Sequence, residues 1–370
     1  MSSGHHVVFT EDDTLFRLME MALRRQATEE GLRALRYFYG AATNAPLATL
    51  LSMADRLDLP RGITATVCRD ETALETALAE ADAVVVETTP LPEPLVAACG
   101  RARLIQQFGR VCGHIALPAA RQAGIPVANL VRLASLSCAE HTTALVLALA
   151  RRLLPAHAAV QARHDPASPP PPADTPLRNR FNWAGLSGFR LLARSTIGFI
   201  GMGETAGFVA PRLSAMGMRV LYHKRQPLGS AEEQALGGIT HAALPALLAE
   251  SDFVTLHLPH HAGTEKCVDA AFLRAMKPGA FLINTARGGL VDERALFEAI
   301  RSGHLAGAAL DVYRTEPVPP EAPLLGLPEV IWTPHIGGGE PDYMIADSEA
   351  VLANIARAWR GGTPEGLMTT

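Results

Sequence analysis

The chain has 370 residues, of which 48% are apolar and 19% are charged, and its formal net charge at pH 7 is −4. This composition predicts a folded protein with room for two domains, and it excludes a disordered or strongly basic chain. Binding to nucleic acid or to an anionic membrane is therefore not expected. The longest apolar run in a helical pattern, residues 144–150, stops at Arg151 and Arg152 and is too short to span a bilayer.

The N-terminal residues lack a basic segment followed by an apolar one, so no signal peptide is predicted. The cysteines are odd in number, scattered and without a CxxC pair, which favours neither a disulfide framework nor a metal site. We therefore expect a cytoplasmic protein without a bound metal. The five cysteines are Cys68, Cys99, Cys112, Cys138 and Cys267.

Apolar runs typical of strands alternate with helical patterns along the chain. The first third contains such runs at residues 6–9, 34–38, 81–89, 102–108 and 125–130, with a helical stretch at 71–80. The middle contains them at residues 196–203, 218–223, 252–258, 280–286 and 306–312. Continuous apolar strands that alternate with helices predict parallel sheets covered by helices on both faces. The fold class is therefore α/β, with two doubly wound parallel-sheet domains and a cleft between them.

Two helices are expected at the joins between the domains. Ser137 followed by Glu140 resembles a capping box and predicts a helix from residue 139 to about 154. The helical segment 340–362 would return the chain to the first domain. We expect one domain from residues 1–131 and 338–370 and the other from residues 132–337. Residues 165–176 are rich in proline and predict a surface loop inserted in the second domain.

A glycine-rich turn follows the strand-like residues 196–200. Gly201 permits a tight turn, and Gly203 lets the backbone approach a pyrophosphate. Glu204 and Thr205 begin a helix whose first N–H groups point at such a ligand, and Ala206 allows close packing of that helix. A strand before the turn and a second strand after the helix predict a dinucleotide site, because GxGxxA alone is a weak signal.

The second strand of this unit ends in a basic stretch. An acid at this position would accept a hydrogen bond from the ribose 2′-OH of NAD, but here the candidates are His223, Lys224 and Arg225. Cations can bind the 2′-phosphate of NADP through charge-assisted hydrogen bonds. NADP(H) is the preferred cofactor on this pattern, and NAD(H) stays possible because a solvated basic loop would look the same.

Three polar groups follow later strands, where ligands bind in parallel sheets. Arg287 follows the run 280–286, Asp311 and Glu316 follow the run 306–310, and His335 precedes three glycines. Together they offer a cation for a carboxylate, a proton donor near pH 7 and an acid that orients the donor. That combination suits hydride transfer to a 2-oxo acid.

In order and spacing these segments resemble the D-isomer-specific 2-hydroxyacid dehydrogenase family, of the glyoxylate/hydroxypyruvate reductase type. The resemblance rests on GMGETA, HLP, NTARGGLVDE, LDVYRTEP and TPHIGGG, and it covers residues 81–335 and more loosely both ends. It implies a Rossmann NAD(P)-binding domain, a flavodoxin-like substrate domain and a catalytic triad of Arg287, Glu316 and His335. The other cofactor contacts implied are Leu258 and Pro259 on the adenosine side and Thr285, Ala286, Asp311 and Gly337 on the nicotinamide side.

The expected roles in this triad follow from the chemistry of the side chains. Arg287 can hold a substrate carboxylate through two hydrogen bonds, and His335 as imidazolium can give a proton to the carbonyl oxygen. Glu316 would hold the ring and favour its charged form. Formate dehydrogenases resemble this pattern but pair their histidine with glutamine, so the acid argues for a hydroxy-acid substrate.

The loop after the run 102–108 resembles the family's substrate-binding loop. It would present Gly109, Arg110 and Val111 to the substrate carboxylate. A second glycine is usual at the position of Val111, so the substrate is less defined than the reaction. Arg110 either extends into solvent or meets a second anionic group on the substrate.

Other functions remain open on the sequence. The resemblance also extends to corepressor-like proteins that sense dinucleotides, and a same-fold dehydrogenase could act on a donor such as phosphite. The expected partners are a small 2-oxo or 2-hydroxy acid and, by the resemblance, a second copy of the chain in a homodimer.

Overall fold

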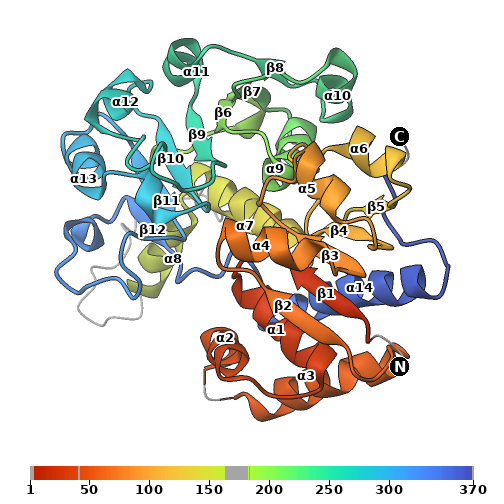
Figure 1. Ribbon diagram of the computed structural model, residues 1–370. Helices are drawn as coiled ribbons and strands as arrows, with labels where there is room; N and C mark the ends of the chain where they lie inside the picture. Colours follow the sequence, from red (N-terminus) through yellow and green to blue (C-terminus); the bar gives the residue numbers. More distant parts are fainter. Residues whose placement is uncertain (1–3, 41, 163–181, 183, 369–370) are drawn as a thin grey trace. The chain divides into compact units, whose positions relative to one another are not determined.

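The computed structural model describes residues 4–40, 42–162, 182 and 184–368 (Figure 1). It divides the chain into two compact units, Met1–Leu136 with Gly339–Thr370, and Ser137–Gly338. The sequence analysis placed this division at residues 131/132 and 337/338. The proline-rich segment 165–176 lies outside the described residues.

The first unit is built on a five-stranded sheet in the order β2-β1-β3-β4-β5, and all its neighbouring strands are parallel. This is the flavodoxin-like order that was predicted for the substrate domain. The strands are β1 His6–Phe9, β2 Thr64–Val67, β3 Ala83–Val86, β4 Ile105–Gln107 and β5 Val127–Ala128.

Alternate residues of these strands enter two separate cores. Val7 and Phe9 pack with α1, α3 and α14, whereas Val8 packs on the other face with α4, α5 and α6. Burial on both faces explains why the strands read as continuous apolar runs. The helices are α1 Thr14–Arg24, α2 Glu29–Tyr39, α3 Asn44–Arg56, α4 Glu71–Leu78, α5 Glu93–Ala98, α6 Leu117–Gln122 and α14 Pro341–Trp359.

One strand prediction in this unit was wrong. Residues 34–38 lie inside α2, which begins where the Thr28 hydroxyl accepts a hydrogen bond from the Gly31 N–H at 3.1 Å. Ala34 and Leu35 are buried, whereas Tyr37 is exposed, so the short apolar run is one side of a helix. The second strand of this unit is instead β2, which lies further along the chain. Its residues Thr64–Val67 are not among the predicted runs, because their apolar signal is weak.

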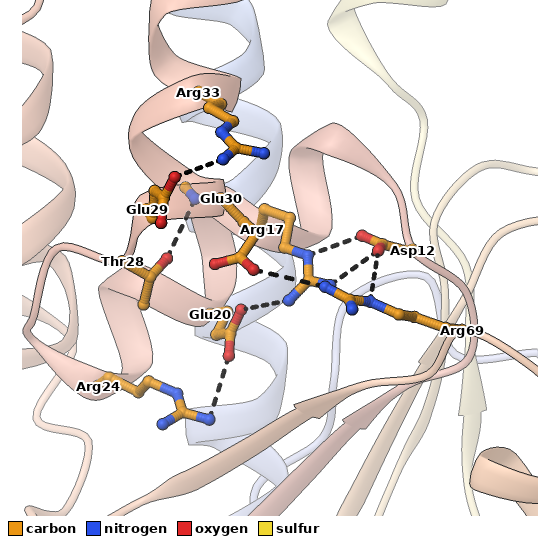
Figure 2. Close-up of polar contacts among 10 residues, drawn as sticks. Asp12, Arg17, Glu20, Arg24, Thr28, Glu29, Glu30, Arg33 and Arg69 are labelled. Atoms are coloured by element: carbon orange, nitrogen blue, oxygen red, sulfur yellow. Dashed lines mark hydrogen bonds and ion pairs between the residues drawn. The ribbon is translucent and has the colours of Figure 1, made fainter.

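A network of ion pairs fixes the chain after β1 to the surrounding helices (Figure 2). Figure 2 shows the Arg17 guanidinium between Asp12 and Glu20, with Arg69 approaching Asp12 and Arg24 approaching Glu20. Arg17 donates two hydrogen bonds to Asp12, at 2.7 and 2.8 Å, and one to Glu20 at 3.0 Å. Hydrogen bonding from Arg17 lowers the pKa of Asp12, so this carboxylate stays ionised in mild acid.

The second unit is built on a seven-stranded parallel sheet in the order β12-β11-β10-β9-β6-β7-β8. When β6 to β11 are numbered 1 to 6 in chain order, they lie in the sheet in the order 3-2-1-4-5-6. This is the Rossmann order that was predicted. The strands are β6 Thr196–Ile200, β7 Arg219–His223, β8 Thr240–His241, β9 Phe253–Leu256, β10 Phe281–Asn284, β11 Gly307–Leu310 and β12 Val330–Trp332.

Helices cover both faces of this sheet. Phe199 and Tyr222 belong to a core with α7 and α9, and Val254 and Leu282 belong to a core with α11, α12 and α13. The helices are α7 Leu133–Ala150, α8 Leu153–Gln161, α9 Glu204–Ala215, α10 Ser230–Ala235, α11 Leu244–Glu250, α12 Ala270–Ala275 and α13 Glu293–Arg301, with short 3₁₀ turns at Leu192–Arg194, Gly288–Leu290 and Pro323–Gly326.

Helix α7 begins earlier than the capping signature predicted. Ser137 lies inside the helix, because the carboxylate of Asp347 accepts a hydrogen bond from the Leu133 N–H at 3.0 Å and so caps the helix there. By length and composition alone α7 could cross a bilayer, which residues 144–150 could not. Val146 and Ala150 lie fully buried in the core of the second unit, as expected for a core helix.

Candidate active site

The glycine turn between β6 and α9 has the geometry of a phosphate cradle. Gly201 has φ +92°, a conformation that favours glycine, and its N–H donates to the His223 carbonyl at 2.9 Å. A Cβ on Gly201 would overlap the carbonyl of His257, whereas a Cβ on Gly203 would meet open space. Ala206 is fully buried against the sheet, as expected for the third position of the motif.

The N-terminus of α9 adjoins this cradle and has no side-chain cap. Gly203 is the N-cap residue, and Glu204 and Thr205 form the first turn, both half-buried. N–H groups at an uncapped helix N-terminus bind anionic ligands such as a pyrophosphate. The residues present therefore fit a dinucleotide. Leu258 extends beside Gly201, and Pro259 follows it on the surface.

The basic stretch lies next to the cradle. His223 is the last residue of β7, and Lys224 and Arg225 follow it directly. The His223 ring stacks on His241 and its Nδ1 lies 3.0 Å from the Ala242 carbonyl, so the packing of the sheet holds this ring. Within the described part of the chain, no hydrogen bond or ion pair engages the side chain of Lys224 or Arg225.

Asn284, the last residue of β10, holds the turn that carries Arg287. Its side chain is 1% exposed, donates to the Arg287 carbonyl at 2.9 Å and accepts from the Ala286 N–H at 3.0 Å. The Arg287 side chain is exposed and donates to the Ala286 carbonyl at 2.7 Å. Thr285 is buried, and its hydroxyl lies 2.8 Å from that of Thr142. The sequence analysis missed Asn284, although a lone amide at the end of an apolar strand is a usable signal.

His335 and Glu316 meet at the ends of neighbouring strands. His335 Nδ1 lies 2.7 Å from Glu316 Oε2, and the other oxygen of Glu316 accepts from the Tyr313 N–H at 3.0 Å. Because a carboxylate only accepts, Nδ1 carries the proton and Nε2 is the nitrogen left for a ligand. Arg287, Glu316 and His335 line one cavity of about 340 Å³. The structure thus brings together the three side chains that the sequence singled out.

Asp311 directly follows β11 and contacts the loop that carries His335. Its carboxylate is 1% exposed and accepts from the Thr333 hydroxyl at 2.6 Å and from the N–H groups of Ile336 and Gly337 at 3.0 and 2.7 Å. Burial alone would raise the pKa of Asp311, but these hydrogen bonds and one from His141 hold it below its ordinary value. Asp311 therefore acts in this structure as an ionised clamp on the loop that carries His335.

The predicted substrate loop belongs to the first unit. Gly109 follows Phe108 after the end of β4 and has φ +127°, and its carbonyl accepts from the Leu130 N–H at 3.1 Å. The Arg110 carbonyl accepts from Asn129 Nδ2 at 3.3 Å, and the Val111 side chain is 53% exposed. The loop is thus held through its backbone, and the Arg110 and Val111 side chains are exposed.

A Rossmann sheet, an uncapped glycine turn and a cavity with an arginine and a histidine–carboxylate pair define a nucleotide-dependent oxidoreductase with two α/β domains. Residues 143–337 match the model of the D-isomer-specific 2-hydroxyacid dehydrogenase NAD-binding domain. The chain belongs to this family.

The names of similar proteins are consistent with this family. The chain is 32% identical over 290 residues to a glyoxylate reductase of Korarchaeum cryptofilum, covering 78% of this chain and 83% of that protein. It is 34% identical over 293 residues to a D-3-phosphoglycerate dehydrogenase of Mycobacterium leprae, covering 79% of this chain. The chain spans about half of that relative's length, 52%.

A solved structure with the same fold is the NADPH-dependent glyoxylate/hydroxypyruvate reductase of Sinorhizobium meliloti in complex with NADP and malonate. It is 25% identical, with a TM-score of 0.55, and the match covers 99% of this chain and 97% of that one.

Proposed function

We propose that this protein reduces a small 2-oxo acid to the D-2-hydroxy acid with NADPH, and catalyses the reverse oxidation with NADP⁺. The observation that carries the proposal is the cavity in the second unit, where Arg287, Glu316 and His335 lie together. A carboxylate-binding cation next to an oriented proton donor is what reduction of a 2-oxo acid requires.

The side chains divide the reaction between them. Arg287 binds the substrate carboxylate and polarises the adjacent carbonyl, because its exposed guanidinium has hydrogen-bond donors to spare beyond its bond to Ala286. His335 gives the proton from Nε2 to the carbonyl oxygen, while Glu316 holds Nδ1–H and stabilises the imidazolium. Bound NADPH supplies the hydride. In the oxidative direction, neutral His335 takes the proton from the hydroxyl.

The preference for NADPH rests on the basic stretch after β7. Lys224 and Arg225 directly follow the residue whose carbonyl receives the Gly201 N–H. Two cations without ion-pair partners in the described structure would attract a 2′-phosphate, whereas NAD(H) offers only a neutral hydroxyl there. The NADPH-dependent relative from Sinorhizobium supports this preference. His223 would border the adenosine, together with Leu258 and Pro259.

Further contacts follow from the family. The substrate loop, formed by Gly109, Arg110 and Val111, would contact the substrate carboxylate. The nicotinamide would be bordered by Thr285, Ala286, Asp311 and Gly337. A homodimer is part of the proposal, and sedimentation equilibrium of the purified protein tests it.

Initial rates test the proposed function. NADPH and NADH are each mixed with glyoxylate, hydroxypyruvate, pyruvate and larger 2-oxo acids, and absorbance at the nicotinamide band is followed. The proposal predicts oxidation of NADPH with at least one acid and a higher kcat/KM with NADPH than with NADH. Tight binding of dinucleotide without turnover of any acid would instead favour a dinucleotide sensor.

A further inference from the structure

The cavity that contains the proposed catalytic side chains has a second set of charged groups. His260, Glu265 and Arg314 line it together with Arg287 and His335. Glu265 accepts from Arg314 Nη1 at 3.0 Å through one oxygen and pairs with His260 Nε2 through the other. The proposed reaction uses none of these three residues. The cavity therefore has two histidine–glutamate pairs, of which only His335–Glu316 has an assigned role.

Two glycines bring this second set next to the Arg287 turn. A Cβ on Gly288 would overlap the carbonyl of Tyr313 and approach the N–H of Arg314 at 2.5 Å. A Cβ on Gly289 would overlap the ring of His260. The NTARGG segment is thus packed against the backbone of Tyr313 and Arg314 on one side and the His260 ring on the other. This contact gives a physical reason for two successive glycines after Arg287.

The spare hydrogen-bond donors of the cavity are on its arginines. Both oxygens of Glu265 are engaged, by His260 and Arg314, and both oxygens of Glu316 are engaged, by His335 and the Tyr313 N–H. An arginine has five N–H donors. The described structure gives the Arg314 side chain a single hydrogen bond, to Glu265, and leaves it 53% exposed. Anionic groups, rather than cations, would therefore be bound here.

Glu265 holds the two basic groups in place. Hydrogen bonding with His260, and then the charge of Arg314, lower the pKa of Glu265, so it is ionised under all mild conditions. A carboxylate that Arg314 shares with His260 fixes where the remaining N–H groups of Arg314 lie, and also where His260 Nδ1 lies, which donates only from the imidazolium form. This reduces the entropy lost when a ligand binds.

We propose that Arg314 and His260 recognise a second anionic group, and that the substrate is a 2-oxo acid with a carboxylate or phosphate at its far end. This inference rests on the proposed function, because the oxo-acid end must occupy Arg287 and His335. The far group then meets Arg314 and the His260 ring across the same cavity. Arg314 and His260 are specificity-determining residues in this arrangement.

Matched pairs of substrates test the inference in the wild-type protein. Oxaloacetate is compared with 2-oxobutyrate, 2-oxoglutarate with 2-oxopentanoate, and 3-phosphohydroxypyruvate with hydroxypyruvate, each with saturating NADPH. We expect kcat/KM to be about tenfold higher for the doubly charged member of at least one pair, the lower end for a charge-assisted hydrogen bond at a half-exposed side chain. The three pairs distinguish a far carboxylate from a far phosphate.

Three variants assign the effect to residues. Arg314→Met should remove the preference for the doubly charged acid and change kcat/KM for its singly charged partner by less than about twofold, since only the far group contacts Arg314. Arg314→Lys should restore part of the preference. Arg301→Met is the matched control, because Arg301 is an exposed arginine on α13 that pairs with Glu298 and does not line the cavity.

The outcomes separate this inference from the proposed function. Equal kcat/KM within every pair, or equal losses for both members in Arg314→Met, would overturn the inference and leave the reductase intact. Failure of every acid to oxidise either NADPH or NADH would refute the proposed function and this inference with it.

Discussion

Replacing Asp311 with asparagine should remove one of the hydrogen bonds that hold the His335 loop, the one from the Gly337 N–H. In the wild-type protein one carboxylate oxygen accepts from Thr333 and Ile336, and the other accepts from the Gly337 N–H at 2.7 Å. An amide oxygen can keep the first two hydrogen bonds. The amide NH₂ then faces the Gly337 N–H, and two donors cannot bond to each other. The change is therefore local and nearly isosteric.

The expected size follows from the burial of this group. Asp311 is 1% exposed, so the lost bond is a fully buried charge-assisted one, worth about 1.5–3 kcal/mol. If the lost bond is needed to hold His335 in its reactive position, its free energy is added to the activation barrier. The kcat for reduction then falls by about ten- to a hundredfold. The free energy of unfolding, measured by urea denaturation, should fall by a comparable amount.

Asp252→Asn is the control for this prediction. Asp252 accepts from the Thr196 N–H at 2.9 Å and from Lys277 at 2.7 Å, at the amino ends of β6 and β9. Its replacement should lower stability but leave kcat per folded molecule unchanged. If Asp311→Asn is destabilised and still turns over at the wild-type rate, the carboxylate does not position His335 and this reasoning is wrong.

Four further variants test other parts of the account. Arg287→Ala should lower kcat/KM for the oxo acid far more than it weakens NADPH binding, and equal losses would remove Arg287 from the carboxylate. His335→Gln should abolish reduction in a rate assay and keep NADPH affinity by fluorescence titration; near-normal turnover would rule out the proton donor. Neutralising Lys224 and Arg225 should weaken NADPH but not NADH by about tenfold or more, and an unchanged preference would reject the 2′-phosphate site. Glu11→Gln should be less stable than wild type at pH 7 in urea unfolding, with the difference shrinking as the pH falls below the ordinary glutamate pKa; a difference independent of pH would contradict this.

The pH dependence of the last variant follows from the loop after β3. Glu11 accepts from the N–H groups of Glu87 and Thr88, both at 2.8 Å, from that of Thr89, and from the Thr88 hydroxyl. Burial alone would raise the pKa of Glu11, but these bonds hold it below its ordinary value. A depressed folded-state pKa stabilises the fold above the unfolded-state pKa, and the stabilisation is lost as the pH falls through the folded value.

The alternation of strands and helices and the candidate catalytic side chains could be predicted because their signals are local, whereas the strand orders followed from the family resemblance. Continuous apolar strands alternate with helices in both sheets, and Arg287, Glu316 and His335 each follow a strand. In a parallel sheet all carboxyl ends lie at one edge, so sequence order is enough to bring these residues together.

The errors concern features that depend on contacts distant in sequence. The run 34–38 has the residue types of a strand, but its burial pattern is that of helix α2. Helix α7 begins before Ser137 because Asp347, more than two hundred residues further along the chain, supplies its cap. The second charged set around Glu265 forms only when separate loops pack on the Arg287 turn. No local pattern shows such contacts.

The central claim is hydride transfer to C2 of a 2-oxo acid with formation of the D product. The most direct measurement uses NADPH doubly deuterated at C4, the best 2-oxo acid of the rate panel, and chiral separation with mass analysis of the product. The account predicts the D-2-hydroxy acid with one deuterium on C2. Formation of the L enantiomer, or of a product without deuterium, would contradict it.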